Sequence, residues 1–467
     1  MPLSQRDAAR VRFELSKTCE LGIEGATVVT GAGRRQANVY ITGGRIATVT
    51  AERRSAARRI DATGLLLMPG MVDAHVHFMD PGSPDREDFL TGSAAAARAG
   101  VTTVIEHTHG SPVRNRSDLE AKVLHLASRS RVDFALGAHA WPAETGHVAP
   151  LWRAGAAFLK AFTCTTHGIP GHSPAELKAL FEETRQVGAI CLLHCEDEEM
   201  TAGAERRLRA SARADGGVIA EWRSPEAELL AVERTAVLAM RTGARAVIAH
   251  ASSPSVLVAF ERARLSAGEN LWVETCPQYL TLLESEARSE GPFRKFTPPA
   301  RARGDADLAE MWHAVAGGRV DYISSDHAPS TRKQKLAGSI WDVHFGLPGI
   351  DTTLPVLLDG AHRGLITYEK VVELYSEVPA RIYGLAPRKG RLAPGADADL
   401  VLVAPELRWT VNDKDILSRA GWSPFSGRRL TGRAVQTYLR GEAVMEEGRV
   451  VGQPGQGHFV PGPGAAG

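Results

Sequence analysis

Apolar stretches in the middle of the chain alternate with amphipathic ones, which predicts parallel strands separated by helices. Helical patterns between the strands include Ser173–Val187, with Ser173 as a candidate N-cap, and Glu226–Thr242. The strand-like runs are apolar on both faces, as expected where a barrel and its helices bury both sides. The pattern predicts an α/β protein with a (β/α)8 TIM-type barrel. The eight predicted strands are Met71–Phe78, Thr102–His107, Val132–His139, Ala156–Phe162, Ala189–His194, Ala246–His250, Leu271–Cys276 and Tyr322–Ser325.

Both ends of the chain instead show short strand-like runs separated by glycines, including a Gly43-Gly44 hairpin signal. We expect these runs to form one small β-sandwich domain, residues 18–65 plus 389–467, beside a barrel in residues 66–388. Residues 1–17 are polar and are expected to form a flexible N-terminal segment. The Gly- and Pro-rich chain from Gly452 onward is expected to be an extended tail.

Composition narrows the class of protein. The 467 residues are 43% hydrophobic and 23% charged, as in ordinary globular proteins, and the net charge of +1 predicts neither a nucleic-acid nor a membrane partner. There is no apolar run of 18 residues and no signal-peptide core at the start. The five cysteines are odd in number and contain no Cys-x-x-Cys pair, which favours a reducing, cytoplasmic location.

Metal-binding side chains end or occupy five of the predicted strands. His75 and His77 are one residue apart, so their side chains point to the same face of a strand. In a parallel barrel the carboxyl ends of the strands hold the active site. Imidazole and carboxylate suit zinc and related divalent ions. The predicted site residues are His75, His77, Lys160, His194, His250 and Asp326.

Lys160 is the unusual member of this set. A buried lysine without a partner is costly and tends to lose its proton. Its neutral amine can react with carbon dioxide, and the resulting carbamate has two oxygens that can bridge two metal ions.

Several motifs extend this pattern over almost the whole chain. They are Pro69-Gly70-Met71-Val72-Asp73-Ala74-His75-Val76-His77, Ala99-Gly100-Val101-Thr102-Thr103-Val104, Glu274-Thr275-Cys276-Pro277, Ser325-Asp326-His327-Ala328-Pro329 and Gly395-Ala396-Asp397-Ala398-Asp399-Leu400-Val401. The set resembles the amidohydrolase superfamily, in its cyclic amidohydrolase branch of dihydroorotases, allantoinases and hydantoinases.

This resemblance implies a metal-dependent hydrolase with two divalent ions, zinc expected, held by the six predicted ligands with carboxylated Lys160 as the bridge. The ions would share a water, lower its pKa and give a hydroxide that attacks a ring amide. Asp326 would be the catalytic residue that takes the proton and passes it to the leaving nitrogen. Relatives are commonly dimers or tetramers, so a homo-oligomer is expected. A catalytically silent scaffold is the alternative, but such relatives lose metal ligands, and none is lost here.

Substrate-facing positions depart from the dihydroorotase pattern. Met79 stands where those relatives carry an arginine that clamps the substrate carboxylate, and His109 and Thr297 stand where they offer asparagine. Thr165 replaces the tyrosine that hydantoinases place beyond the lysine. Asp80 and the loop around His167 are more similar to allantoinase.

The favoured substrate is therefore a cyclic ureide, as in allantoinase, with dihydroorotase and hydantoinase or dihydropyrimidinase activity as alternatives. His107 is also expected to lie near the pocket. The candidate substrate contacts are Met79, His109, Thr165, His167 and Thr297.

Overall fold

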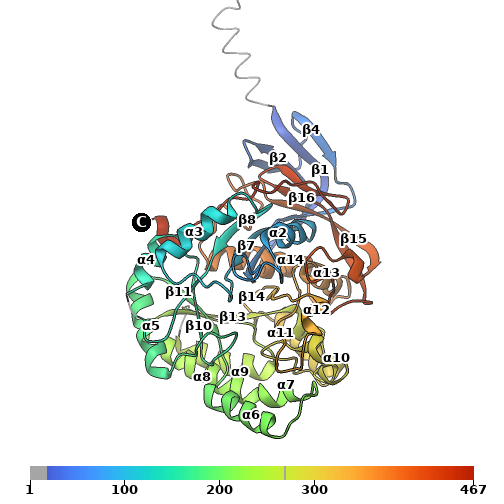
Figure 1. Ribbon diagram of the computed structural model, residues 1–467. Helices are drawn as coiled ribbons and strands as arrows, with labels where there is room; N and C mark the ends of the chain where they lie inside the picture. Colours follow the sequence, from blue (N-terminus) through green and yellow to red (C-terminus); the bar gives the residue numbers. More distant parts are fainter. Residues whose placement is uncertain (1–17, 145, 268–269, 467) are drawn as a thin grey trace, which may run out of the picture.

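The computed structural model describes residues 18–144, 146–267 and 270–466, so the predicted flexible segment 1–17 lies outside the described residues. The central chain is α/β, with helices packed around parallel strands (Figure 1). All eight predicted strands are present at their predicted places. They are β6 (Met71–Val76), β7 (Val101–Glu106), β8 (Asp133–Leu136) with β9 (Ala138–His139), β10 (Leu159–Phe162), β11 (Ile190–His194), β12 (Arg245–Ile248), β13 (Leu271–Thr275) and β14 (Tyr322–Ile323).

The helices lie between and after these strands. The predicted helix after Ser173 is confirmed, because Ser173 and Glu176 form a reciprocal capping box and Gly188 ends the helix in the left-handed conformation. The helices are α2 (Phe89–Arg98), α3 (Arg116–Leu126), α4 (Val148–Arg153), α5 (Pro174–Val187), α6 (Glu198–Ala210), α7 (Val218–Trp222), α8 (Pro225–Thr242), α9 (Pro254–Ala267), α10 (Glu286–Glu290), α11 (Asp305–Ala316), α12 (Arg332–Lys335), α13 (Thr353–His362), α14 (Tyr368–Val372) and α15 (Val378–Ile382).

The third predicted strand is split at Gly137, where it changes partner. The Gly137 N–H donates to the carbonyl of Glu106 on β7, whereas the next N–H, of Ala138, donates to Phe158 just before β10 (both 2.9 Å). A Cβ at residue 137 would lie 2.3 Å from the Phe158 ring, so only glycine fits at this crossing.

The described parallel strands consequently form two sheets, ordered β6-β7-β8 and β9-β10-β11-β12-β13-β14, and not one continuous closed barrel. Their free edges meet where β6 ends. The His77 N–H donates to the carbonyl of His327, just after β14, at 2.7 Å, and Val76 and His327 form an isolated parallel bridge. The carboxyl ends of the first and last strands are thus held together, although the strands make no full ladder.

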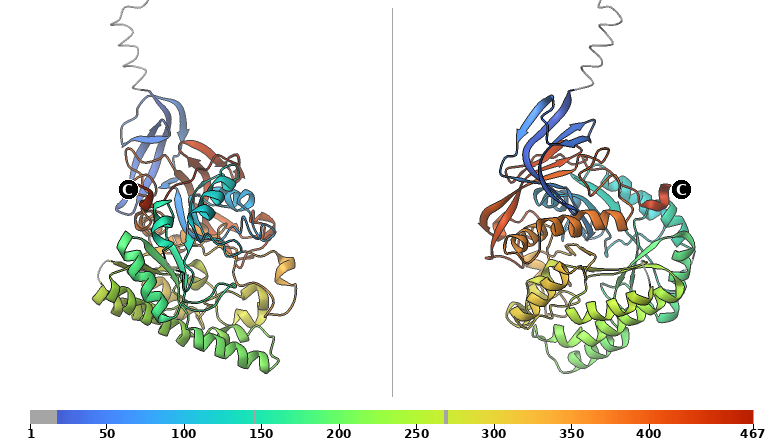
Figure 2. Two further views of the ribbon diagram at one scale, coloured as in Figure 1. Left: turned by 60° about the vertical axis from the view of Figure 1, so that its left-hand side comes forward. Right: turned by 180° about the vertical axis from the view of Figure 1, so that it is seen from behind.

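Segments near the two ends of the chain form a third sheet, which has nine strands (Figures 1 and 2). Its order is β18-β17-β16-β15-β5-β1-β2-β3, with β4 beside β1, and Gly43 and Gly44 make the predicted hairpin between β2 and β3 with positive φ. The sheet includes Leu66–Pro69, which the predicted boundary at residue 65 assigned to the barrel. Its strands are β1 (Cys19–Thr30), β2 (Gly33–Thr42), β3 (Arg45–Thr50), β4 (Ala56–Asp61), β5 (Leu66–Pro69), β15 (Leu400–Thr410), β16 (Arg429–Leu439), β17 (Glu442–Glu446) and β18 (Arg449–Val450).

The segment after Gly452 is extended but is not a free tail. The Phe134 N–H on β8 donates to His458, and the Val460 N–H donates back to Phe134, at 3.0 and 2.8 Å. The segment ends in a short turn, Pro463–Ala466, beside α4 (Figure 1). It therefore packs along the first parallel sheet, a placement that glycine and proline content alone does not predict.

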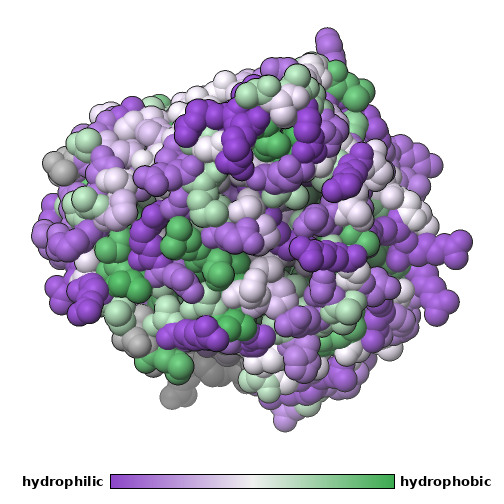
Figure 3. Space-filling model, turned by 90° about the horizontal axis from the view of Figure 1, so that it is seen from below, coloured by the Kyte–Doolittle hydropathy of each residue, from purple (hydrophilic) through white to green (hydrophobic). Residues whose placement is uncertain are grey.

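The surface shows scattered apolar side chains. On the face seen from below, small apolar areas interrupt a mostly polar surface (Figure 3). Exposed apolar residues include Met200 on α6 and Leu230 and Val237 on α8. No helix among the described residues is long and apolar enough to cross a membrane.

Replacing Gly137 tests the strand crossing. We expect Gly137→Ala to destabilise the protein by about 1–3 kcal/mol, because the new methyl group forces Phe158 or the backbone to move. Gly203→Ala is the matched control. Gly203 lies within helix α6 with no atom closer than 3.9 Å to an added Cβ, so alanine should stabilise by about 0.5–1 kcal/mol. Urea unfolding measures both, and equal midpoints for Gly137→Ala and wild type would contradict the crossing.

Candidate metal centre

All six predicted metal ligands line one small cavity at the carboxyl ends of the parallel strands. The cavity also includes aromatic side chains Phe162 and Phe345, and it has a free volume of about 20 Å³. This is room for an ion or a water molecule. Its ligand-bearing wall consists of His75, His77, Lys160, His194, His250 and Asp326.

Hydrogen bonds at Nδ1 orient both histidines of β6. The His75 Nδ1 lies 3.0 Å from both carboxylate oxygens of Glu274 on β13, and the His77 Nδ1 donates to the carbonyl of His107 at 2.5 Å. Burial lowers the pKa of His75 well below its usual value, which disfavours the charged ring. The Nε2 atoms of His75 and His77 are not used by these contacts, and they lie 3.3 and 3.5 Å from Asp326 Oδ1.

His194 and His250 face each other on the next two strands. The His194 Nδ1 lies 3.1 Å from the His250 Nε2, and the His194 Nε2 donates to Glu196 at 2.8 Å. Burial opposes a charge on His194, but its hydrogen bonds to Cys164 and Glu196 raise its pKa to about 9. Burial lowers the pKa of His250 well below its usual value. The two facing nitrogens can therefore hold one proton or one cation between them.

These separations fit divalent metal ions. Ligands about 2.0–2.2 Å from a tetrahedral ion lie roughly 3.3 Å from one another. The 3.3 and 3.5 Å separations around Asp326 and the 3.1 Å separation of His194 and His250 match this value. The donor set is imidazole and carboxylate, which suits zinc, cobalt or manganese.

Strained backbone at two of these positions supports a functional role. His250 and Asp326 follow β12 and β14 and have backbone φ angles of +41° and +47°. Residues other than glycine seldom adopt this conformation. Asp73 holds this region together. Its carboxylate accepts from the Ser325 N–H at 3.1 Å and from the Tyr375 hydroxyl at 2.7 Å, which ties the first strand to the last.

Three groups of described residues bring metal-binding atoms within 4.8 Å of one another, and two of them already contain a cation. In the group Cys164, His194 and Glu196, the Arg223 guanidinium lies 3.2 Å from the sulfur and 3.1 Å from the carboxylate. In the group Asp133, Asp397 and Asp399, the Lys389 ammonium lies 3.0 Å from Asp397 and 2.7 Å from Asp399 and also bonds Asp133. Only the group His75, His77 and His107 has no built-in cation.

The Lys160 side chain is buried and forms no hydrogen bond or ion pair with the described residues. Only 2% of it is exposed, and its Nζ lies 5.2 Å from the centre of the Phe162 ring. Burial lowers the pKa of this lysine to about 8. A substantial fraction of the amine is therefore neutral near pH 7–8, which is the form that reacts as a nucleophile.

The candidate substrate contacts divide into two groups. His109, His167 and Thr297 line the cavity, and the rings of His109 and His167 stack with centres 4.2 Å apart. Met79 and Thr165 do not line it, which corrects their predicted place. Met79 turns through a positive φ and accepts a hydrogen bond from Thr108 at its sulfur, while Thr165 is exposed and its N–H is bound by Glu198.

Three carboxylates that the sequence did not assign to the site form hydrogen bonds with residues of the site. They are Asp73 and Glu274, each within a mostly apolar and buried strand, and Glu196, two residues after His194. Each is less than 1% exposed. A carboxylate in a buried strand must be paired, and this is the signal by which the sequence could have marked Asp73 and Glu274.

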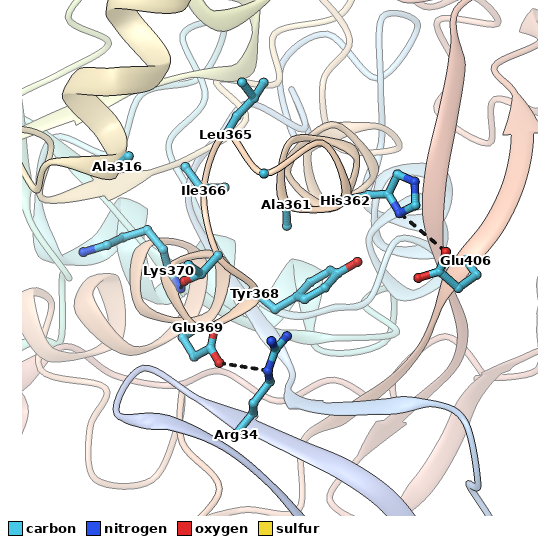
Figure 4. A pocket seen from close by; sticks show the side chains of 12 residues that line it. Arg34, Ala316, Ala361, His362, Leu365, Ile366, Tyr368, Glu369, Lys370 and Glu406 are labelled. Atoms are coloured by element: carbon cyan, nitrogen blue, oxygen red, sulfur yellow. Dashed lines mark hydrogen bonds and ion pairs between the residues drawn. The ribbon is translucent and has the colours of Figure 1, made fainter.

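A larger cavity of about 660 Å³ lies elsewhere, between β2, β15 and the α13–α14 connection (Figure 4). Its charged side chains pair with each other. Arg34 lies 3.4 Å from Glu369, and His362 lies 3.6 Å from Glu406. This cavity contains none of the predicted ligands, so size alone does not identify the reactive site.

Removing the Glu274 carboxylate tests how the site is oriented. Glu274→Gln keeps the shape of the side chain but no longer accepts a charge-assisted hydrogen bond from His75. We expect zinc affinity, measured by chelator competition, to fall about 10–100-fold. Glu261→Gln, at a surface ion pair with Arg319, is the control and should bind zinc as wild type does. Unchanged affinity in Glu274→Gln would show that this carboxylate does not position His75.

Comparisons with known proteins agree with this geometry. The sequence matches the amidohydrolase family over residues 66–444. It is 35% identical to an allantoinase of Rubrobacter xylanophilus, over 94% of this chain and 97% of the relative, and 34% identical to a dihydroorotase of Halobacterium salinarum, over 84% and 93%. The structure of an L-hydantoinase from Arthrobacter aurescens superposes with a TM-score of 0.90 at 29% identity, covering 95% of this chain and all of that one. These relatives are hydrolases acting on carbon–nitrogen bonds in cyclic amides, which confirms the predicted enzyme class, and the chain belongs to the amidohydrolase family.

Proposed function

We propose that the protein is a metal-dependent hydrolase that opens a cyclic amide or ureide ring, with an allantoinase-like substrate favoured. The observation that carries this proposal is the orientation of the first-strand histidines. Glu274 and the carbonyl of His107 fix Nδ1 of His75 and His77, and both Nε2 atoms face Asp326. Such second contacts are what metal-binding histidines require.

Two divalent ions, zinc expected, would be held by the six ligands lining the cavity. When bound, they supply a polarised substrate carbonyl and a water of lowered pKa. The protein's own contribution is proton transfer. The Asp326 carboxylate, placed between the two first-strand histidines, accepts the proton of the attacking water and returns it to the leaving ring nitrogen.

Lys160 would complete this ligand set as a carbamate. Its neutral amine nitrogen bonds to the carbon of carbon dioxide and loses one proton, which leaves an anion with two oxygens. The absence of any ion pair to Lys160 among the described residues supports this reaction, because a free ammonium would be buried without compensation. The carbamate is instead negatively charged, and this charge balances part of the positive charge of two bound cations.

The cavity wall favours an uncharged substrate. Among the described residues that line it there is no arginine and no lysine other than Lys160, so they offer no guanidinium to a substrate carboxylate. His109, His167, Phe162 and Phe345 offer neutral, flat surfaces to a planar ring. A ring is larger than the free volume of about 20 Å³, so binding requires the side chain of His167 or Phe345 to move.

The alternatives are dihydroorotase and hydantoinase or dihydropyrimidinase activity. The first needs a carboxylate partner that the cavity does not offer, and the second is supported by the likeness to a hydantoinase structure. A silent scaffold is disfavoured, because every predicted ligand is kept and all six converge.

We extend the proposal to the domain arrangement, the oligomeric state and the location of the enzyme. The two parallel sheets, which meet at the ends of β6 and β14, would together correspond to the (β/α)8 barrel, and the terminal sheet, with β5 added to residues 18–65 and 389–467, would be the β-sandwich domain. Leu230 and Val237, seven residues apart on one face of α8, are exposed and suit a homo-oligomeric contact. Five unpaired cysteines support a cytoplasmic location.

A substrate panel tests the choice of ring. Protein reconstituted with zinc, cobalt or manganese is assayed with allantoin, hydantoin, dihydrouracil and dihydroorotate. We expect the highest kcat/KM for allantoin and a value for dihydroorotate at least about 100-fold lower, since a missing bidentate ion pair is worth several kcal/mol. Efficient turnover of dihydroorotate without allantoin would contradict this order.

Replacing Lys160 tests its bridging role. Lys160→Ala should lose at least about 100-fold in kcat/KM and bind fewer ions per chain, because the second ion loses its bridge. Lys178→Ala, on the exposed face of α5, is the control for loss of a lysine. Intact-mass measurement should find one added carbon dioxide on wild type and Lys178→Ala but not on Lys160→Ala. Full activity of Lys160→Ala would refute the bridge.

A further inference from the structure

We propose that His107 is a further nitrogen ligand of the ion held by His75 and His77, so that three histidines form one side of that site. This inference rests on the metal centre of the proposed function and adds a residue outside its six ligands. It concerns the residue immediately after β7, whose side chain sequence reasoning placed only near the pocket.

Distance supports the assignment. One ring nitrogen of His107 lies within 4.8 Å of a ring nitrogen of both His75 and His77. The His107 ring centre is 4.8 Å from that of His75 and 4.3 Å from that of His77. These spacings suit histidines that bind one metal ion, because two histidine ligands of the same ion have ring centres about 5 Å apart.

The His107 ring also has no other partner. It is 1% exposed, and neither ring nitrogen forms a hydrogen bond with any described residue. A buried polar atom without a partner is unfavourable, because it has lost its hydrogen bonds to water and gained none in return. The Phe158 ring meets the His107 ring edge-on, with centres 5.0 Å apart, and offers no hydrogen-bonding group. A cation bound at one nitrogen would offset part of this cost.

The charges around the ring leave the place open for a cation. The other two groups of metal-binding atoms contain Arg223 or Lys389, whereas this group contains no cation of the protein. Asp326 supplies a negative charge opposite the rings.

The backbone of His107 is already fixed to the site. Its N–H donates to the Val76 carbonyl at 3.1 Å, and its own carbonyl accepts from His77 Nδ1 at 2.5 Å. The N–H and the carbonyl of residue 107 therefore both form hydrogen bonds with residues at the end of β6. These bonds hold its ring beside His75 and His77. A ligand held in this way loses little freedom on binding.

The proposal has a thermodynamic consequence. An ion bound by His75, His77 and His107 has more histidine ligands than one bound between His194 and His250. The first ion should therefore be retained longer when a chelator is added. Three histidines around one ion also suit zinc and cobalt, whose visible spectrum reports ligand number and geometry.

His107→Gln tests the assignment, with His139→Gln as the matched control. His139 is equally buried on β9, its ring nitrogens are also unpartnered, and its ring centre lies 5.8 Å from that of His107. Both variants and wild type are loaded with Co²⁺, and the visible spectrum and the Co²⁺ affinity from chelator competition are measured. We expect His107→Gln to change the spectrum and to weaken the tighter ion at least about tenfold. His139→Gln should leave both unchanged.

The outcomes separate this inference from the proposed function. Wild-type spectrum and affinity in His107→Gln would overturn the His107 assignment alone, whereas a wild-type protein that binds no Co²⁺ would overturn the metal centre itself. Thermal unfolding of the metal-free proteins checks folding. If His107→Gln unfolds, His107→Asn replaces it and is judged by the same two measurements, and equal effects of the residue 107 and residue 139 variants would also count against the assignment.

Discussion

The hydrogen bond between His75 and Glu274 is the interaction on which the rest of the site depends. A buried imidazole can ligate a cation through Nε2 only if its proton is held at Nδ1, and Glu274 holds it there with both oxygens at 3.0 Å. The His107 carbonyl does the same for His77. These two contacts decide which atoms face Asp326, and so they decide where positive charge can bind.

The fold serves this geometry by holding distant strands in register. Asp73 ties Ser325 and Tyr375 to β6, and the His77 N–H reaches the carbonyl of His327, so the first and last parallel strands present their ligands together. Gly137 lets the third strand pass from one parallel sheet to the other. The positive φ of His250 and Asp326 is tolerated because this framework fixes their neighbours.

Local patterns in the sequence predicted much of this. The eight strands follow from short apolar runs, and the six candidate ligands, which line one cavity, follow from their place in or just after the strands, because both patterns depend on neighbours along the chain. Contacts between distant segments were not predictable in the same way. The partner change at Gly137, the packing of the chain after Gly452 and the support from Glu274 depend on residues far apart in sequence. Met79 and Thr165 were misplaced because loop positions do not reveal which way a side chain points.

The cavity brings the six candidate ligands together, and the described residues that line it include no arginine, which is why we propose a neutral ureide and not an acidic ring as the substrate. Anomalous X-ray diffraction at the zinc absorption edge, on crystals of the zinc-loaded protein, tests the underlying metal centre most directly. The structure predicts two peaks, one bonded to His75, His77 and Asp326 and one bonded to His194 and His250. An anomalous map without a peak within bonding distance of these side chains would contradict it.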